Sequence, residues 1–125
     1  MHVKKSAFLL LILVLGTACL ATDQAQLTAA SAEWKQNKGY ASLEVIVAAH
    51  FRNGMPRKEV ERLLGPEDYA PGEGSAVYYS SDKQGPLGDT GSIATYGLVV
   101  EYMERNAPYT VTDRLQRWIL GPVGE

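Results

Sequence analysis

One stretch decides the fold: residues Gly54–Pro66, which read GMPRKEVERLLGP. Val60, Leu63 and Leu64 recur at the spacing of one helix face, and charged residues occupy the positions between them. A proline near the start and a glycine-proline pair at the end are typical helix boundaries. The stretch therefore predicts a helix of about two turns, which is too short to be stable alone and must pack on a larger element.

A second helix is predicted just before this one. Leu43, Ile46, Val47, His50 and Phe51 fall at the positions i, i+3, i+4, i+7 and i+8 of an amphipathic helix. The β-branched run in the same segment would also suit a strand. The five-position match and the two alanines that follow the run favour a helix.

The C-terminal half has the pattern of strands. Residues 76–80 and 96–103 alternate in polarity, and we expect a third, bulged strand over Tyr109–Leu120. Between the first two, Ser81–Thr95 is rich in turn-forming residues and is expected to be a loop. Neither the helices nor the strands can bury their own apolar faces. We therefore predict an α+β two-layer sandwich, with two short helices packed on one face of a three-stranded antiparallel sheet.

The N-terminus has the pattern of a targeting signal. Lys4 and Lys5 precede nine apolar residues, 7–15, and small residues follow. A membrane-spanning helix needs about 20 apolar residues, so a cleaved signal peptide over residues 1–18 is favoured over a retained membrane anchor. Residues 19–40 are mostly small and polar. We expect them to form a flexible tether, with a short helix near residues 31–36, and residues 41–125 to form the folded domain.

The only cysteine, Cys19, ends this signal. Residues 15–19 read LGTAC and resemble a bacterial lipobox, which implies lipid transfer to the Cys19 thiol and cleavage before it. An exported domain with one cysteine has no disulfide partner for it, and lipidation accounts for both its position and its solitude. A triacylated cysteine would hold the domain stably on a membrane. The alternative is a plain secretory signal.

A family resemblance adds to this interpretation. Residues Phe51–Pro66, the aromatic run at residues 77–79 and the run from Gly97 to Tyr102 resemble the SmpA/OmlA (BamE-like) family of small outer-membrane lipoproteins. The resemblance implies this α+β domain and an accessory role in outer-membrane β-barrel assembly or envelope maintenance. Pro56 and the long Ser81–Thr95 loop depart from the family pattern. The same fold unit resembles β-lactamase inhibitor proteins, so a periplasmic inhibitor or ligand-binding module is the alternative.

Composition and motifs exclude several function classes. The formal net charge of −2 is unlike that of a nucleic-acid binder, which would show a basic face. His50 is the only histidine after the signal, so it lacks a second metal ligand and is expected to be structural. No nucleophile-elbow motif is present. We therefore expect a protein that is not an enzyme and has no cofactor, no metal and no small-molecule substrate.

Two kinds of partner are expected. Membrane lipid would be engaged through acylated Cys19, and an envelope protein would be bound by the domain. The candidate docking residues are Tyr96 and Tyr102 on a predicted strand, with Asp82 and Asp89 in the predicted loop. Tyrosines on a sheet face away from the helices would form an exposed aromatic surface. The expected location is the periplasmic face of the outer membrane, with a secreted or periplasmic protein as the alternative.

Overall fold

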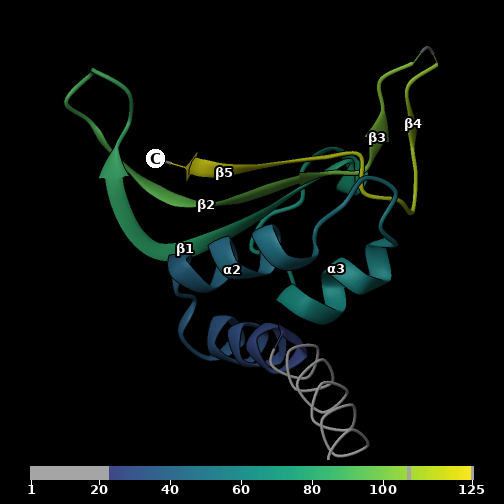
Figure 1. The fold of residues 1–125 in the computed structure, drawn as a ribbon. Helices are drawn as coiled ribbons and strands as arrows, with labels where there is room; N and C mark the ends of the chain where they lie inside the picture. Colours follow the sequence, from purple (N-terminus) through teal and green to yellow (C-terminus); the bar gives the residue numbers. More distant parts are fainter. Residues whose placement is uncertain (1–22, 107, 125) are drawn as a thin grey trace, which may run out of the picture.

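The computed structural model describes residues 23–106 and 108–124. The predicted signal peptide and Cys19 lie outside the described residues. Figure 1 shows three helices on one side of an antiparallel sheet. In chain order the elements are a leading helix over residues 23–37, α2 (Tyr40–His50), α3 (Arg57–Leu64), the short 3-10 turn η1 (Gly72–Gly74), β1 (Ala76–Pro86), β2 (Ile93–Glu101), β3 (Met103–Glu104), β4 (Thr110–Val111) and β5 (Arg117–Gly124).

The sheet has the strand order β1-β2-β5, and both pairings are antiparallel. β2 lies at its centre, and its alternate residues Leu98 and Val100 are fully buried. Their partners across the sheet, Tyr79 and Val77 on β1, are also buried. The predicted fold class, an α+β structure with helices packed on a three-stranded antiparallel sheet, is confirmed. β3 and β4 form a separate two-stranded ribbon.

The two helices predicted from their periodicity are present. In α2 the buried apolar side chains are Leu43 and Ile46, and α3 buries Val60, Leu63 and Leu64. Gly65 follows α3 with φ +73°, a positive value that glycine adopts readily, and the helix ends there. Pro56 precedes the helix in extended conformation, where it pairs with Arg114 ahead of β5.

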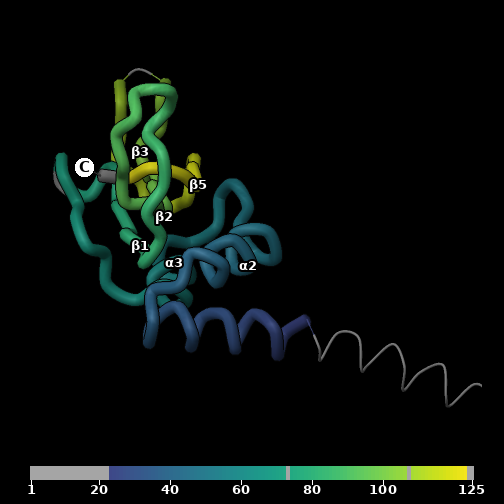
Figure 2. The backbone as a smooth tube through the Cα atoms, turned by 90° about the vertical axis from the view of Figure 1, so that its left-hand side faces the viewer, coloured from purple at the N-terminus to yellow at the C-terminus, as the bar shows by residue number. Residues whose placement is uncertain are grey.

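The expected tether is wrong for residues 23–37, and the short helix expected near residues 31–36 is part of a longer one. These residues form a helix that packs beneath α2 and α3, on the side away from the sheet (Figures 1 and 2). Leu27, Ser31 and Trp34 are buried, and Trp34 is completely so. The helix adds a third layer to the two that were expected. The composition is the reason for the error: two large apolar side chains, Leu27 and Trp34, in 15 helical residues do not predict burial.

The leading helix also completes the C-terminal end of α3. The last four carbonyls of a helix have no partner within it, and buried carbonyls need one. Here each of the four carbonyls accepts a hydrogen bond. The Glu61 carbonyl accepts from Gly65 N–H at 2.8 Å, and the Arg62 carbonyl accepts from Lys35 Nζ at 2.6 Å. The Leu63 carbonyl accepts from Ser31 Oγ at 2.6 Å, and the Leu64 carbonyl accepts from Trp34 Nε1 at 2.9 Å. Three of the four donors are side chains of the leading helix, so this helix satisfies polar groups as well as burying apolar surface.

The expected loop Ser81–Thr95 is also wrong. β1 continues to Pro86 and β2 starts at Ile93, so the two strands form a long hairpin with a turn over residues 87–92. A bulge interrupts the pairing between Ser80 and Gln84, and the Ser81 hydroxyl bridges it by donating to the Tyr96 carbonyl at 2.6 Å. The turn-forming residues that suggested a loop build this bulge and the curled end of the hairpin.

The third strand is shorter and later than the expected Tyr109–Leu120. Only Thr110–Val111 and Arg117–Gly124 are strands, and the first of these pairs with β3 outside the main sheet. Leu115, between them, is fully buried and exchanges backbone hydrogen bonds with Gly54 and Met55, each at 2.8 Å. The break in alternation along this segment therefore marks a change of partner rather than a bulge.

Candidate functional site

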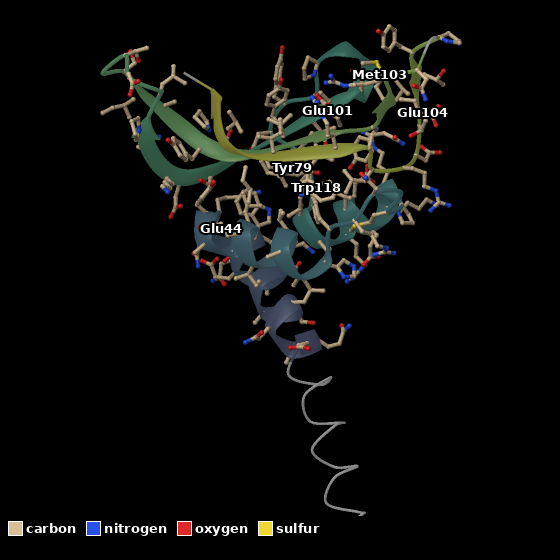
Figure 3. The ribbon with its side chains drawn as sticks, turned by 45° about the horizontal axis from the view of Figure 1, so that its top comes forward. Glu44, Tyr79, Glu101, Met103, Glu104 and Trp118 are labelled. Atoms are coloured by element: carbon tan, nitrogen blue, oxygen red, sulfur yellow. The ribbon has the colours of Figure 1, made fainter. Side chains whose placement is uncertain are left out.

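The sheet has two faces of different character. Tyr79 and Trp118 lie between the sheet and the helices, whereas Glu101 lies on the opposite side (Figure 3). The opposite side carries an apolar row in which Tyr78, Val99 and Ile119 are direct cross-strand partners. Tyr78 and Val99 are half-buried, and Ile119 is 54% exposed.

Tyr69 extends this row beyond β1. It pairs with Tyr78 through the backbone, with Tyr78 N–H donating to the Tyr69 carbonyl at 2.8 Å. The two rings are 5.8 Å apart between centroids, and Tyr69 is 63% exposed. We call Tyr69, Tyr78, Val99 and Ile119 the outer apolar row. Contiguous exposed apolar side chains of this kind mark binding surfaces on soluble domains.

A charged cluster lies two residues along the strands from this row. The Glu101 carboxylate accepts hydrogen bonds from Arg117 at 2.8 and 3.1 Å and from Arg105 at 3.2 and 3.3 Å. Burial by itself would raise the pKa of Glu101, but Arg117 and Arg105 together hold it below its ordinary value. Two arginines against one carboxylate leave one net positive charge beside the outer apolar row.

Tyr102 does not lie on an exposed surface, contrary to the expectation. It is fully buried, and the Arg57 guanidinium lies 4.3 Å from its ring centroid on the helix side of the sheet. Its hydroxyl and that of Tyr79 have no hydrogen-bond partner among the described residues. Burial raises the pKa of both hydroxyls. The parity of β2 explains the error, because Tyr96, Leu98, Val100 and Tyr102 share the inner face.

Tyr96 and Asp82 are brought together, but by contacts within the chain. The Tyr96 ring packs edge-on against Tyr40 of α2 at 5.9 Å, with Lys83 Nζ 4.7 and 5.1 Å from the Tyr40 and Tyr96 centroids. Asp82 Oδ1 accepts the Tyr40 backbone N–H at 3.2 Å. Burial, with Glu44 and Tyr96 nearby, raises the pKa of Tyr40. This cluster fixes the hairpin to α2.

Tyr96 also shapes the hairpin itself. Its hydroxyl donates to the Pro86 carbonyl at 2.6 Å, which draws the ring across Gly85. A Cβ added at Gly85 would lie 2.8 Å from that ring, so the close approach requires glycine. The role of Tyr96 in the structure is therefore to hold the curl of the hairpin.

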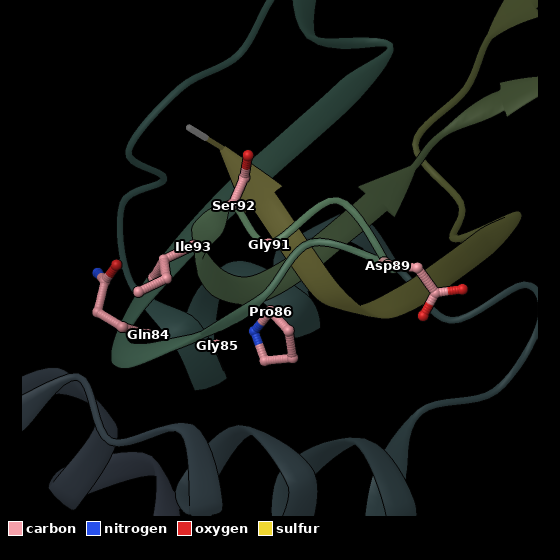
Figure 4. Close-up of a pocket in the computed structure, with 8 residues that line it drawn as sticks. Gln84, Gly85, Pro86, Asp89, Gly91, Ser92 and Ile93 are labelled. Atoms are coloured by element: carbon pink, nitrogen blue, oxygen red, sulfur yellow. The ribbon is translucent and has the colours of Figure 1, made fainter.

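Asp89 lies apart from the other three candidate residues, at the hairpin turn. The turn and the strand ends enclose an open hollow of about 390 Å³ that is lined mainly by glycine and apolar atoms. Ile93 and Asp89 are both among the residues that line it, and Ile93 is 69% exposed (Figure 4). The hairpin end therefore also presents an exposed apolar side chain.

His50 lies at the end of α2, in the position that its helical stripe predicts. Its Nε2 is 3.3 Å from Glu59 Oε1, and Glu59 also pairs with Arg62. The hydrogen bond from Arg62 is the main reason that the pKa of Glu59 is lowered. These contacts link α2 to α3. Within residues 23–106 and 108–124, no three of the histidine, cysteine, aspartate and glutamate side chains group in a way that could hold a metal ion.

An exposed aromatic surface on this face of the sheet was expected, but it was assigned to Tyr96 and Tyr102, and the residues of the outer apolar row were not named. Strand parity could have found Tyr78 and Val99, because both alternate with buried neighbours. Nothing in the sequence indicates that Tyr69 joins the row, since it does so through a single backbone bridge outside any strand. Cys19 lies outside the described residues. In the part of the chain that is described, no helix is both long enough and apolar enough to cross a membrane.

Comparison with known proteins gave no relative: the chain matches no family model, no curated protein and no solved structure.

Proposed function

We propose that this chain is a lipid-anchored lipoprotein of the bacterial outer membrane that acts as a scaffold rather than as an enzyme. Acylated Cys19 would be its anchor, and the outer apolar row would dock an envelope protein. The SmpA/OmlA resemblance suggests a partner in β-barrel assembly or envelope maintenance.

The observation that carries the docking part of the proposal is the outer apolar row. Helices cover one face of the sheet, and among the described residues no element covers the other. Exposed tyrosine and isoleucine side chains there, beside a charged cluster, match the apolar centre and polar rim of a protein interface. Tyrosine is also among the residues that contribute most to binding energy at such interfaces.

Two experiments test the parts separately. In a Gram-negative host, the full-length chain should incorporate labelled palmitate, and the labelled protein should fractionate with the outer membrane. Cys19→Ser should lose both the label and the membrane association. A wild-type chain that incorporates no palmitate would refute the proposal that the protein is a lipoprotein.

The docking surface is tested by a photo-crosslinking amino acid at Tyr78 in the same host. Glu44, which is exposed on α2, serves as the control position on the helix side. We expect adducts to an envelope protein from position 78 and none from position 44. Equal adduct formation at both positions, or none at Tyr78, would show that the outer apolar row does not dock a protein.

A second candidate is a periplasmic inhibitor that inserts the hairpin end into a partner's cleft. The observation in its favour is Ile93, which is 69% exposed beside the hollow at the hairpin turn. Inhibition of a secreted hydrolase by the purified chain, abolished by Ile93→Asp, would support this function. Ile93→Asp should leave docking through the outer apolar row intact, which separates the two functions.

A further inference from the structure

The direction of the backbone groups in the sheet can be followed strand by strand. Tyr78 N–H donates to Tyr69, and the Tyr78 carbonyl accepts from Asp68, so both groups point away from β2. Backbone direction alternates along a strand. Val77 and Tyr79 therefore face β2, and the same alternation turns Val99 toward β5.

The alternation then fixes which groups of β5 are free. Val99 pairs with Ile119, so Ile119 directs its N–H and carbonyl toward β2. Trp118 and Leu120 direct theirs toward the outer edge. No described strand pairs with that edge, and no backbone partner of these groups occurs among the described residues. The next outward position is Pro122, which has no N–H to offer.

This edge lacks the usual protection along its middle. Exposed sheet edges normally carry charged side chains or proline that prevent pairing with another strand. Here Arg117 and Pro122 guard the two ends, and the residues between them are uncharged. Trp118 and Leu120 are only partly buried, and Ile119 is 54% exposed. The edge is thus a short apolar segment whose four outward backbone groups have no partner among residues 23–106 and 108–124.

We propose that this edge pairs with a second copy of the chain, antiparallel and about a two-fold axis at Ile119. In this register Trp118 lies opposite Leu120 of the partner subunit, and the two residues exchange both backbone hydrogen bonds. By symmetry, Leu120 lies opposite Trp118 of the partner subunit and forms the same two hydrogen bonds. Every outward N–H and carbonyl of Trp118 and Leu120 is therefore paired. The proposal goes beyond the proposed function and holds whether or not Cys19 is acylated.

Other registers satisfy fewer groups. Centring the axis on Leu120 sets Trp118 opposite the partner's Pro122, which cannot donate to the Trp118 carbonyl. Centring it on Trp118 sets Leu120 opposite the partner's Gln116, whose N–H already bonds Glu101 at 2.8 Å in each copy. The edge is therefore self-complementary at Ile119, which is why a second copy fits it better than an unrelated strand.

The side chains agree with this register. Ile119 would lie against the partner's Ile119, so the outer apolar row would run without a break across both copies. Arg117 would lie opposite the partner's Gly121, so no like charges face each other across the axis. Each subunit contributes the same patch, as a two-fold interface requires.

A cysteine cross-link tests the register directly in the full chain. Residues directly opposite in a non-hydrogen-bonded antiparallel pair have Cα atoms about 4.5 Å apart, within the range that a disulfide spans. With Cys19→Ser removing the natural thiol, Ile119→Cys should give a disulfide dimer under mild oxidation. Val99→Cys is the matched control, because two Val99 residues would lie three strand spacings apart, roughly 14 Å. A dimer from both variants or from neither would overturn the proposal.

A charge-pair experiment covers the case in which the cysteine variants fold poorly. Ile119→Lys and Ile119→Glu each place like charges across the axis and should weaken the dimer roughly tenfold or more. Mixing the two variants should restore it as a heterodimer, measured by light scattering or sedimentation. A wild-type chain that stays monomeric at 100 µM, roughly the upper range of such measurements, would overturn the proposal, as would a mixture that stays monomeric. Pairing of the edge with a foreign protein alone would appear as a monomer in these experiments.

Discussion

Replacing Trp34 with alanine is expected to destabilise the fold by about 3–5 kcal/mol. Trp34 is fully buried in the core, and its Nε1 donates to the Leu64 carbonyl at 2.9 Å. The substitution removes a large buried side chain and leaves a cavity between the leading helix and α3. Domains of this size have stabilities of about 5–15 kcal/mol, so the loss would be a large share of the total.

A second substitution separates the hydrogen bond from the packing. Trp34→Phe keeps most of the buried apolar surface but leaves the Leu64 carbonyl without its donor. An unsatisfied buried acceptor costs about 1–3 kcal/mol, so this variant should lie between the wild type and Trp34→Ala. Gln36→Ala is the control, because Gln36 is exposed on the same helix and should change stability by less than about 0.5 kcal/mol.

The measurement is urea unfolding followed by circular dichroism, which avoids the change in fluorescence caused by losing a tryptophan. With a slope near 2 kcal/mol per molar urea, about 4 kcal/mol lowers the unfolding midpoint by about 2 M. If residues 23–37 were a tether in solution, both Trp34 variants would match Gln36→Ala. A loss below about 1 kcal/mol for Trp34→Ala would refute the packing described here.

Three further predictions follow from the core and the charged cluster. Gly97→Ala should destabilise the fold by more than about 1–3 kcal/mol in thermal or urea unfolding, because the new Cβ would overlap the Tyr79 carbonyl in the neighbouring strand. Tyr102→Phe should leave stability unchanged or raise it by about 1 kcal/mol, since it removes a buried hydroxyl without a described partner. Glu101 has a lowered pKa in the folded state, so its stabilising contribution is present above the ordinary value of 4.5 and is lost as the pH falls through the folded value. We therefore measure the free energy of unfolding of the wild type and of Glu101→Gln at pH 7 and pH 3. The wild type should be more stable at pH 7, by no more than about 1 kcal/mol, and this advantage should be smaller at pH 3.

The parts of the fold that could be predicted are the elements in which the spacing of apolar side chains indicates which face is buried. The stripes of α2 and α3 and the alternation along β2 are of this kind. Pro56 and Gly65 also marked the limits of α3, because proline and glycine restrict or permit backbone conformations by themselves.

The parts that were missed depend on contacts between distant segments. The leading helix buries few apolar groups and is held partly by Ser31, Lys35 and Trp34 donating to carbonyls of α3. Every residue has a backbone carbonyl, so the sequence of α3 does not indicate which of its carbonyls need a donor from another segment. The sequence of the leading helix does not indicate that its side chains supply those donors. The same limit applies to Tyr69, whose place beside Tyr78 depends on one bridge to the edge of β1.

The packing of the leading helix changes what the proposed anchor would do. Only residues 20–22 separate Cys19 from Asp23, the first described residue of that helix. Four steps between neighbouring Cα atoms span at most about 15 Å. An acylated Cys19 would therefore hold a packed helix, and through Trp34 the whole domain, close to the bilayer surface. Tethered to one surface, copies of the domain would meet at a raised effective concentration, which favours weak symmetric contacts such as the pairing proposed for β5.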